Sequence, residues 1–554
     1  MPFVAEIFAQ LKAEVDTKVL LEIRDGQVTG VTGGELLELI RKARIFLAAK
    51  GLKKGDRCGL LAANSIRWMA LDLAAMAEGL IVVPLYSRQA PAELVAMIQD
   101  STPALVCCGD ATLRDGIRQN WPGGNWAEAP SHFLFDEIFA SAGVDAVAGL
   151  ELADTDPVTI IYTSGTSGEA KGVMLTAANV GFMLGCTSAR LDLLMGGRSG
   201  RDRIFHYLPF SFCASWIAML TFLLRGSLVT LNTDLTKIPS DMPATAPHYF
   251  LNVPQLLERM RRGVDEQIAQ KGGVAHAIYV RAKAARARQK EKRAQSGDGF
   301  WLWLANTMVF PTIRKKMVGE NLKALICGSA PLTPEAQDYF SMLGIPVLQV
   351  YGLTETTGIC TMDDPNDVAA GHVGPAIPGI EMRLGENDEI VVRGPNVFPG
   401  YWNRPQQTAE ALRDGWFHSG DQGEMDASGK WRIVGRIKNL IVLGSGHKIA
   451  PEAVEEQIAR HLPGAQQVVI VGNGRGYLSA IVTGSVSGEH VQAALDAVNP
   501  ELPHYKQVRV FCLRPEPFSI ENGMLTANGK LKRDLISARM KSEIEEMYRV
   551  RQAV

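Results

Sequence analysis

Residues 163–172 read Thr-Ser-Gly-Thr-Ser-Gly-Glu-Ala-Lys-Gly and directly follow an apolar run at 158–162. A glycine-rich turn after a buried strand leaves backbone N–H groups free to approach an anion, and Lys171 adds a positive charge. The spacing is not that of a Walker A loop, because the glycines and the lysine stand at three-residue steps and no serine or threonine follows the lysine. A flexible surface linker is the alternative, but a strand-like run enters the segment and an amphipathic pattern leaves it. The stretch predicts a phosphate-binding loop formed by Thr163, Ser164, Gly165, Thr166, Ser167, Gly168 and Lys171.

Length and composition indicate a globular protein of at least two domains. The chain has 554 residues, of which 46% are hydrophobic, enough for a sizeable core. Its formal net charge of −2 argues against a general polyanion binder, so we expect no nucleic-acid partner. The eight cysteines show no C-x-x-C pairing, and residues 1–15 lack the pattern of a signal peptide. The longest apolar runs are shorter than the roughly 20 residues of a membrane-spanning helix, and we expect a cytoplasmic location.

The first part of the chain alternates between helical and strand-like patterns. Apolar residues at helical spacing predict a helix over 36–47, and a short apolar run predicts a buried strand over 57–62. The alternation continues with predicted helices at 65–77 and 90–100 and predicted strands at 81–84 and 104–108. Strands that alternate with helices are typical of an α/β fold with a parallel sheet.

The span 255–320 departs from this alternation and is predicted to be a helical insertion. It carries a run of cationic residues from 281 to 293, followed by Phe300, Trp301 and Trp303. Cations beside indole rings can mark contact with a membrane surface. The favoured interpretation is a solvated helix whose aromatic side chains pack inward, because charge runs are usually solvent-exposed faces. Peripheral membrane contact is the alternative.

A second, smaller domain is expected at the C-terminal end. Strand-like patterns give way at Gly435 to the sequence Gly-Arg-Ile-Lys. Beyond it, a proline followed by acidic residues predicts a helix start, and apolar runs predict strands at 468–471 and 478–482. The expected division is a large N-terminal domain of layered α/β sheets, residues 1–435, and a small α+β domain, residues 436–554.

Two further motifs place polar groups after strand-like runs. Gly-Ser-Ala-Pro-Leu at 328–332 has a glycine turn that lets a flat ring lie close to the backbone. Tyr-Gly-Leu-Thr-Glu-Thr at 351–356 offers an aromatic face, hydroxyls and a carboxylate. Glu355 is a candidate ligand for Mg²⁺, because that ion prefers oxygen ligands.

Two more motifs lie near and beyond the predicted domain boundary. Trp-Phe-His-Ser-Gly-Asp at 416–421 ends in a carboxylate that can accept both hydroxyls of a ribose, with Arg436 as a second candidate contact. Thr-Ala-Asn-Gly-Lys at 526–530 places Lys530 after a glycine turn near the C-terminus. Taken alone, each of these residues is equally a candidate for a surface charge. Their occurrence together, in this order, favours a nucleotide site.

Together these segments resemble the adenylate-forming superfamily, which includes acyl-CoA synthetases, peptide adenylation domains and firefly luciferase. The resemblance covers nearly the whole chain and rests on T-S-G-T-S-G-E-A-K-G, G-S-A-P-L, Y-G-L-T-E-T, W-F-H-S-G-D, G-R-I-K-N and N-G-K-L-K-R. It implies an α/β fold with a mobile C-terminal domain that carries the catalytic lysine. It also implies ATP, Mg²⁺ and CoA.

The resemblance further implies a role for each candidate residue. Lys530 is expected to contact the oxygens of the acid and of the α-phosphate, and Thr354 and Glu355 to organise Mg²⁺ and the α-phosphate. The loop at 163–172 is expected to hold the β- and γ-phosphates. The remaining expected roles are ribose contacts at Asp421 and Arg436, further nucleotide contacts at Gly328, Ser329, Ala330, Tyr351 and Gly352, a hinge at Lys438, and a border of the CoA thiol tunnel at Ser445 and Gly446.

The insertion and the sequence Ile-Glu-Asn-Gly-Met-Leu-Thr at 520–526 are similar to long-chain acyl-CoA synthetases. The implied activity is AMP-forming ligation of a medium- or long-chain fatty acid, or another bulky apolar carboxylic acid, to CoA. The segment 207–212 resembles the family's Leu-Pro-x-x-His segment with Phe212 in place of histidine, and the acyl pocket is expected at Phe210, Phe212 and Trp216. Delivery of the acyl group to a carrier protein or an intramolecular hydroxyl, and a non-catalytic scaffold with the same fold, are the alternatives. The oligomeric state is open, a homodimer included.

Overall fold

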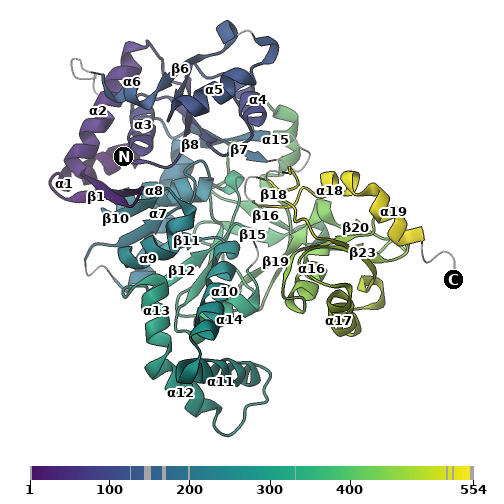
Figure 1. Cartoon of the computed structure of the whole chain (residues 1–554). Helices are drawn as coiled ribbons and strands as arrows, with labels where there is room; N and C mark the ends of the chain where they lie inside the picture. Colours follow the sequence, from purple (N-terminus) through teal and green to yellow (C-terminus); the bar gives the residue numbers. More distant parts are fainter. Residues whose placement is uncertain are drawn as a thin grey trace.

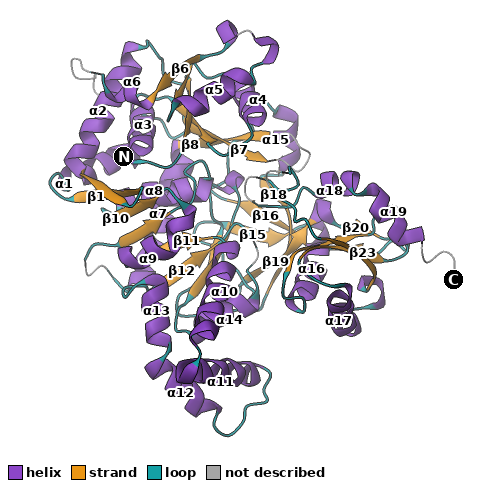
Figure 2. Ribbon diagram, viewed as in Figure 1, coloured by secondary structure: helices purple, strands orange, loops and turns teal. Residues whose placement is uncertain are grey.

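The computed structural model describes residues 3–124, 126–141, 151–164, 170–197, 200–330, 332–519, 522–526 and 529–549. Figure 1 shows a large body formed by the N-terminal part of the chain and a smaller lobe at its side formed by the C-terminal part. A pair of helices projects from the lower edge of the body, as both ribbon views show (Figures 1 and 2). This arrangement confirms the predicted α/β fold with a large N-terminal and a smaller C-terminal part.

The first large sheet has six strands in the order β6 (Ser131–Leu134), β5 (Leu105–Cys108), β3 (Arg57–Ala62), β4 (Ile81–Tyr86), β7 (Pro157–Ser164) and β8 (Ala170–Thr176). The first five strands run parallel, and β7 and β8 form an antiparallel hairpin. Strands β3, β4 and β5 are buried along almost their whole length, which explains why their sequences are continuously apolar. The helices that accompany this sheet are α2 (Gly33–Ala49), α3 (Ile66–Ala77), α4 (Pro91–Ser101), α5 (Ala111–Gln119) and α6 (Phe135–Phe139).

The second large sheet has eight strands in the order β14 (Thr361–Met362), β13 (Val347–Tyr351), β12 (Ala324–Cys327), β11 (Tyr249–Asn252), β9 (Arg203–His206), β10 (Leu228–Asn232), β1 (Lys18–Arg24) and β2 (Gln27–Thr32). The six strands from β13 to β1 are parallel. Because parallel strands end at the same edge, the segments after β12 and β13 lie beside each other. The helices α1 (Phe3–Ala13), α7 (Ala177–Met195), α8 (Cys213–Leu224), α9 (Ile238–Thr245) and α14 (Pro334–Met342) complete this region.

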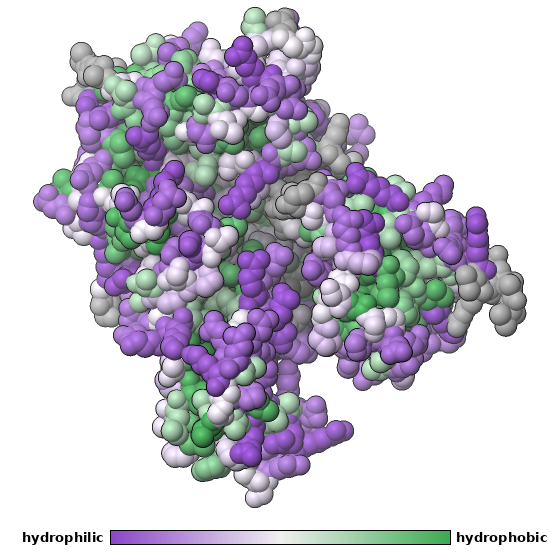
Figure 3. Space-filling model, viewed as in Figure 1, coloured by the Kyte–Doolittle hydropathy of each residue, from purple (hydrophilic) through white to green (hydrophobic). Residues whose placement is uncertain are grey.

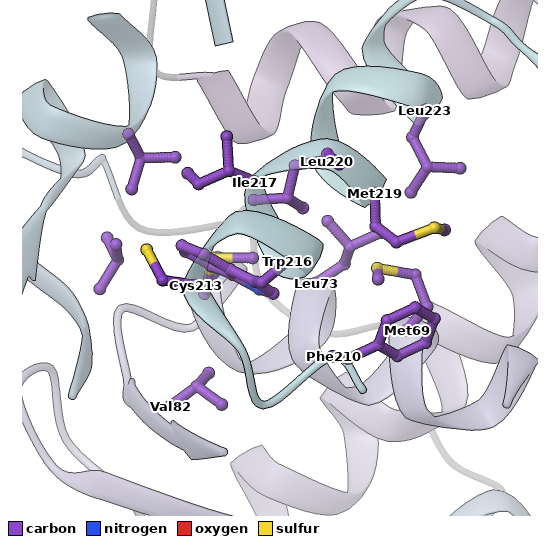
Figure 4. Packing of buried hydrophobic residues seen from close by; sticks show 14 of the residues in the cluster. Met69, Leu73, Val82, Phe210, Cys213, Trp216, Ile217, Met219, Leu220 and Leu223 are labelled. Carbon is purple, nitrogen blue, oxygen red and sulfur yellow. The ribbon is translucent and has the colours of Figure 1, made fainter. Parts of the chain in front are cut away.

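Helix α3 lies between the two large sheets, where it contacts β3 and β4 of one and β1 of the other. It begins where the Ser65 side chain accepts a hydrogen bond from the backbone N–H of Trp68. Apart from Arg67, the residues of this helix are buried, including one charged residue, Asp72. Figure 4 shows Trp216 of α8 in the same apolar cluster as Met69 and Leu73 of α3. The core of the body is therefore continuous across both sheets.

Asp72 gives this core a pH-dependent stability. Trp216 Nε1 donates to Asp72 Oδ2 over 2.8 Å, but burial dominates and raises the pKa of Asp72 to about 7. The pKa of this carboxyl is therefore higher in the folded than in the unfolded chain. Its contribution to stability is fully present below the unfolded pKa and is lost as the pH rises toward 7.

The substitution Asp72→Asn is expected to remove this pH dependence, because the amide keeps an acceptor for Trp216 without ionising. The stability of the variant relative to wild type should rise between pH 5 and pH 8, by at most about 3 kcal/mol, because part of the total effect of such a shift already falls below pH 5. Thermal unfolding across that pH range measures the difference. The exposed Asp25→Asn, at a turn with φ 52° that asparagine tolerates, is the matched control. Parallel pH profiles of Asp72→Asn and wild type would contradict the prediction.

The predicted helical insertion consists of α10 (Pro254–Lys271), α11 (Gly273–Lys290), α12 (Asp298–Met308) and α13 (Phe310–Val318). The favoured interpretation of its aromatic residues is wrong for two of them. Phe300 is 55% exposed and Trp303 is 61% exposed, whereas Trp301 is half-buried. The physical reason is that α12 is apolar all round at its start but has neighbours, α11 and α13, on only part of its circumference. Within the described residues, no helix is both long and apolar enough to cross a bilayer.

The chain then forms a five-stranded sheet of β15 (Glu381–Leu384), β16 (Glu389–Arg393), β17 (Leu412–Arg413), β18 (Trp416–Met425) and β19 (Trp431–Arg436), with α15 (Pro405–Ala411) beside it. The smaller lobe follows with β20 (Ile441–Val442), β21 (Lys448–Ile449), β22 (Ala465–Val471), β23 (Leu478–Gly484), β24 (Val508–Arg514), α16 (Pro451–Arg460), α17 (Gly488–Val498), α18 (Arg533–Arg539) and α19 (Lys541–Arg549). Its apolar cores are separate from those of the body. The predicted domain boundary at 435/436 falls at the end of β19 and stays a prediction.

Candidate active site

An ion pair between a buried carboxylate and a half-buried arginine, at one end of the five-stranded sheet, forms the centre of the candidate site. Asp421 and Arg436 lie directly opposite each other on β18 and β19, and Arg436 Nε is 2.5 Å from Asp421 Oδ1. Tyr351, at the end of β13, donates from Oη to Asp421 Oδ2 over 2.8 Å. Burial raises the pKa of Asp421, and the charge of Arg436 opposes that rise. The structure thus brings both predicted ribose residues together with a tyrosine from another sheet.

Glu355 and Lys171 meet at a third residue, Tyr401. Glu355 lies in a short 3₁₀ turn, Thr354–Thr356, directly after β13. Tyr401 Oη donates to Glu355 Oε1 over 2.9 Å, and Lys171 Nζ lies 5.0 Å from the centre of the Tyr401 ring. The backbone fixes this arrangement, because Trp402 N donates to Gly172 O over 2.8 Å. A carboxylate and an ammonium from distant parts of the sequence are therefore held on one aromatic side chain.

Lys530 enters the same site from the C-terminal segment. Its backbone is held by Thr526, whose N–H donates to Lys530 O and whose Oγ1 accepts from Lys530 N. The pKa of Lys530 is lowered because the surrounding protein removes hydration from the ammonium and because Arg436 repels it. Asp421 and Glu355 act in the opposite direction. The ammonium therefore lies within electrostatic reach of all three groups, although the residue as a whole is exposed.

Lys438 adds a further cation to this site. It lies in the 3₁₀ turn Ile437–Asn439, directly after β19. Burial, and to a lesser extent repulsion from Arg436, lowers the pKa of Lys438 to about 8. The site then holds the cations Lys171, Arg436, Lys438 and Lys530, against the carboxylates Asp421 and Glu355 and, beside Lys438, Asp534. This positive excess suits a ligand that carries several negative charges, such as a polyphosphate.

Contacts between the smaller lobe and the body hold Lys530 in this position. Lys532 Nζ lies 3.6 Å from Glu93 Oε1 on α4, and Lys448 Nζ donates to Asn387 Oδ1 over 3.1 Å. Arg460 Nε lies 3.2 Å from Glu335 Oε2 on α14. Partly exposed contacts of this kind are individually weak, each worth at most about 1 kcal/mol. The lobe is therefore held by bonds that can be exchanged without disrupting either core.

The predicted nucleotide contacts after β12 and β13 lie at neighbouring strand ends. A side chain at Gly328 would put a Cβ 2.6 Å from Val350 Cγ2, and one at Gly352 would put it 2.3 Å from Gly358 O. Ser329 has a φ of 72°, and both Ser329 and its neighbour Ala330 are exposed. The structure therefore places an open turn beside Tyr351, where a flat ring can approach the backbone.

The structure describes the two ends of the predicted phosphate-binding loop at 163–172. Thr163 pairs with Lys171, and Ser164 pairs with Ala170, across the β7–β8 hairpin. This pairing brings the entry to the loop close to Tyr401 and Glu355, because Lys171 faces the Tyr401 ring. Gly165, Thr166, Ser167 and Gly168 lie outside the described residues.

The two residues predicted beside the CoA thiol tunnel are not part of this cluster. Ser445 and Gly446 lie in the exposed turn between β20 and β21. Ser445 Oγ is 2.9 Å from His447 Nδ1, and Gly446 N donates to Leu443 O over 2.8 Å. These contacts stay within the smaller lobe.

The predicted acyl-pocket residues lie on and before α8. Phe210 and Trp216 are fully buried, and Phe210 packs on Trp68 with ring centres 5.0 Å apart. Phe212 is half-buried and packs on Tyr86 at 5.4 Å. Phe212, which stands where the resembling family has histidine, therefore forms an aromatic pair with Tyr86. The role of Phe210, Phe212 and Trp216 in acid binding stays a prediction.

Tyr401 is the site residue that sequence reasoning missed. It belongs to the sequence Pro-Gly-Tyr-Trp at 399–402, and the φ of 152° at Gly400 marks a turn before it. Two aromatic residues directly after such a turn are a detectable signal, because a turn rarely needs them for its own geometry. The partner of Tyr401, Glu355, lies more than forty residues earlier, so its pairing could not be read from the sequence.

Known proteins resemble this chain over nearly its whole length. A long-chain-fatty-acid–CoA ligase of Mycobacterium bovis, FadD15, is 28% identical over 98% of this chain and 96% of its own length. Long chain acyl-CoA synthetase 3 of Arabidopsis thaliana is 26% identical over 96% of this chain and 88% of its own. The solved structure of a fatty acyl CoA synthetase from Mycobacterium tuberculosis shares the fold, with a TM-score of 0.68, 23% identity, and coverage of 98% of this chain and 99% of that one.

Family models identify the chain directly. The model described as AMP-binding enzyme C-terminal domain matches residues 438–552. The model described as AMP-binding enzyme matches residues 8–402, which contain the predicted phosphate-binding loop, Tyr351 and Glu355. The chain belongs to the AMP-binding enzyme family.

Proposed function

We propose that this protein is an AMP-forming fatty acid–CoA ligase, which converts a medium- or long-chain fatty acid, ATP and CoA into acyl-CoA, AMP and pyrophosphate. The names of the relatives above, which match over almost their full lengths, support this class of substrate. The observation that carries the proposal is the meeting of the Asp421–Arg436 pair, Glu355 and Lys530 in one cationic site. These groups come from the body and from the smaller lobe.

In the first half-reaction, a carboxylate oxygen of the acid attacks the α-phosphorus of ATP. A new C–O–P linkage forms, and the bond from the α-phosphorus to the bridging oxygen breaks, so that pyrophosphate leaves with that electron pair. No proton is transferred in this step, and no general base is needed. Catalysis then depends on alignment of the reacting atoms and on stabilisation of negative charge.

The positions of the described residues support a division of labour in this step. We assign the ribose hydroxyls to Asp421 and Arg436, and the adenine ring to the open turn beside Tyr351. Lys171 and the loop before it are assigned to the β- and γ-phosphates. Lys530 is assigned to the oxygens of the acid and the α-phosphate, because it is the cation that the smaller lobe contributes.

The donor groups near Glu355 fit Mg²⁺ carried in with the nucleotide. The Glu355 carboxylate and the Thr354 hydroxyl are oxygen donors in one turn, and Tyr401 orients the carboxylate. Among the residues the structure describes, no group of three or more metal-ligating side chains occurs. A single protein carboxylate is the expected contribution to a Mg²⁺ site when phosphates and waters supply the other ligands. When bound, the ion supplies positive charge that offsets the charge of the phosphates.

In the second half-reaction, the sulfur of CoA attacks the acyl carbon of the acyl-AMP. The C–S bond forms, the C–O bond to the phosphate breaks, AMP leaves, and the thiol proton passes to solvent. The exposed turn with Ser445 and Gly446 is assigned to the CoA side, in a second pose of the smaller lobe reached by a change at Lys438.

The eight thiols of the chain are unpaired, as in proteins of a reducing compartment, which supports a cytoplasmic location.

The test separates adenylation from acyl transfer. Exchange of labelled pyrophosphate into ATP should depend on a fatty acid, and release of AMP should depend on CoA. A series of acids from 8 to 18 carbons should show a broad optimum, because each buried methylene contributes only about 0.8 kcal/mol. Asp421→Asn should abolish exchange, whereas Asp414→Asn, an exposed control on the same sheet, should not.

Each alternative has its own outcome in this test. Exchange without CoA-dependent release of AMP would indicate delivery to a carrier protein or to an intramolecular hydroxyl. Absence of exchange with fatty, aryl and branched acids would indicate a non-catalytic scaffold. Either outcome would overturn the proposal.

A further inference from the structure

The α11–α12 hairpin, residues 273–308, projects from the body and takes no part in the site described above. Figures 1 and 2 show it at the end of the chain segment that leads away from the two large sheets. Helices α11 and α12 pack on each other along their length. Their buried residues, such as Tyr279 and Ala305, join the apolar cluster that also includes Phe205 and Phe250 of the second large sheet, so only the inner side of the hairpin is anchored to the body. The hairpin therefore presents outer faces that no other element of the described residues covers.

Those faces carry an unusual share of exposed apolar side chains. Val274 is 75% exposed and Met308 is 62% exposed, and with Val280, Phe300 and Trp303 they make five of the fourteen large hydrophobic side chains exposed in the described residues. Phe300 and Trp303 are the two aromatic residues among those fourteen. Their ring centres are 6.1 Å apart, on successive turns of α12. Figure 3 shows hydrophobic surface on this projection beside strongly hydrophilic surface.

The same region carries a concentrated positive charge. Residues 254–318 contain fourteen lysines and arginines but five aspartates and glutamates, whereas the whole chain has a net charge of −2. Arg281 lies over the Trp301 ring at 4.4 Å, so a cation and an indole share one position on the hairpin. Lys271, just before α11, lies close enough to Lys316 of α13 that this second ammonium lowers the pKa of Lys271.

The combination of these side chains narrows the choice of partner. Exposed Trp and Phe beside Lys and Arg suit the boundary between lipid head groups and acyl chains, where rings enter the apolar layer and cations meet phosphates. A second copy of the chain would bring like charges together. Bases of a nucleic acid would stack on the aromatic rings but would gain little from Val274, Val280 and Met308, which make up the rest of the exposed apolar set.

We propose that the α11–α12 hairpin docks the protein reversibly on a bilayer that contains anionic lipids. Phe300 and Trp303 insert into the interface, and Lys290 and Lys292 bind head-group phosphates. Lys283, Arg286 and Arg288 of α11 are instead engaged in ion pairs with carboxylates of the protein. No catalytic step is needed for this contact, so it is independent of the proposed function. It is also consistent with that function, because long apolar acids collect in bilayers.

The experiment measures binding of the full chain to vesicles without substrates. Vesicles of phosphatidylcholine with about a third phosphatidylglycerol are compared with pure phosphatidylcholine by sedimentation. The protein should bind the anionic vesicles, and raising the salt from 0.1 M to 0.5 M should weaken binding several-fold, because the cations act through screened charge. Phe300→Ser with Trp303→Ser should lower the affinity about tenfold or more, since two aromatic anchors are lost.

Matched variants keep this test specific to the hairpin. Lys290→Gln with Lys292→Gln should lower affinity for the anionic vesicles, whereas Lys53→Gln with Lys541→Gln, two exposed cations elsewhere, should not. Val28→Ser, which changes a 61% exposed side chain on β2, controls for the loss of apolar surface. Retained circular dichroism and thermal unfolding would show that the double variants fold.

Four results would overturn the proposal. The first two are failure to bind either kind of vesicle and equal binding to neutral and anionic vesicles. The third is unchanged binding of the Phe300 and Trp303 double variant, and the fourth is displacement of the protein from vesicles by a single-stranded polynucleotide. Concentration-dependent dimerisation that is lost in the double variant would assign the surface to a second copy. If the protein binds vesicles but activates no carboxylic acid, the docking proposal stands and only the proposed function is overturned.

Discussion

Replacement of Lys530 by alanine is expected to lower the rate of acyl-AMP formation by roughly a hundred- to a thousandfold, the usual effect of removing one preorganised charge from a developing transition state. The structure gives the reason for so large an effect. The Lys530 ammonium lies within electrostatic reach of Arg436, Asp421 and Glu355, so it is already positioned before substrates bind. Water that replaces it would have to reorganise during the reaction.

The same substitution should leave the second half-reaction almost unchanged. Attack of a thiol on supplied acyl-AMP expels AMP and creates no new bond at the α-phosphorus, so the cation at that phosphate is less needed. The measurements are pyrophosphate exchange for the first step and CoA-dependent release of AMP from synthetic acyl-AMP for the second. Lys541→Ala is the matched control, because Lys541 is an exposed lysine at the start of α19 in the same lobe. Equal loss of both half-reactions would contradict the division of labour.

The buried strands were the most predictable part of the fold. The strands predicted at 57–62, 81–84 and 104–108 correspond to β3, β4 and β5, because strands buried on both faces require continuous apolar sequence. The predicted helix at 65–77 corresponds to α3, whose N-terminal cap is local in sequence. A buried strand and a helix cap can be predicted because each depends on a few adjacent residues and, for the strand, on burial of both faces.

The arrangement of the site was only partly predictable. The order of the motifs indicated that Asp421, Arg436 and Lys530 share one ligand, and the structure places their charges together. The β18–β19 register that makes Asp421 face Arg436 is set by tertiary pairing rather than by the spacing of the two residues. The link from Lys171 through Tyr401 to Glu355 joins three segments, and no local pattern encodes it.

The exposure of Phe300 and Trp303 could not be predicted for a different reason. Apolar side chains on a helix indicate that something covers them, but not that the cover is part of the same chain. The inward-facing interpretation assumed an intramolecular partner. The structure shows that α11 and α13 cover only some positions of α12, so the remaining aromatic positions face outward.

Substitution of Lys438 by proline is expected to have the opposite kinetic signature to the loss of Lys530. Lys438 lies in the 3₁₀ turn Ile437–Asn439, where a φ near −65° is compatible with proline. The hydrogen bond that closes this turn runs from Leu440 N to Ile437 O and does not use the N–H of Lys438. The present pose, with Lys530 in the site, should therefore persist, and acyl-AMP should still form.

Acyl transfer to CoA should fall by roughly a hundredfold, because a ring clash of about 3 kcal/mol in the second pose reduces its population by that factor. Lys438→Ala is the decisive control. It removes the same charge, which lies beside Arg436 with its pKa lowered to about 8, but leaves the backbone free to rotate. If proline acts through the backbone, the alanine variant should transfer acyl groups at nearly the wild-type rate while the proline variant stalls at acyl-AMP. Equal defects in the two variants would instead show that the charge of Lys438 matters in the second pose, and the hinge would then have to lie elsewhere between β19 and β20.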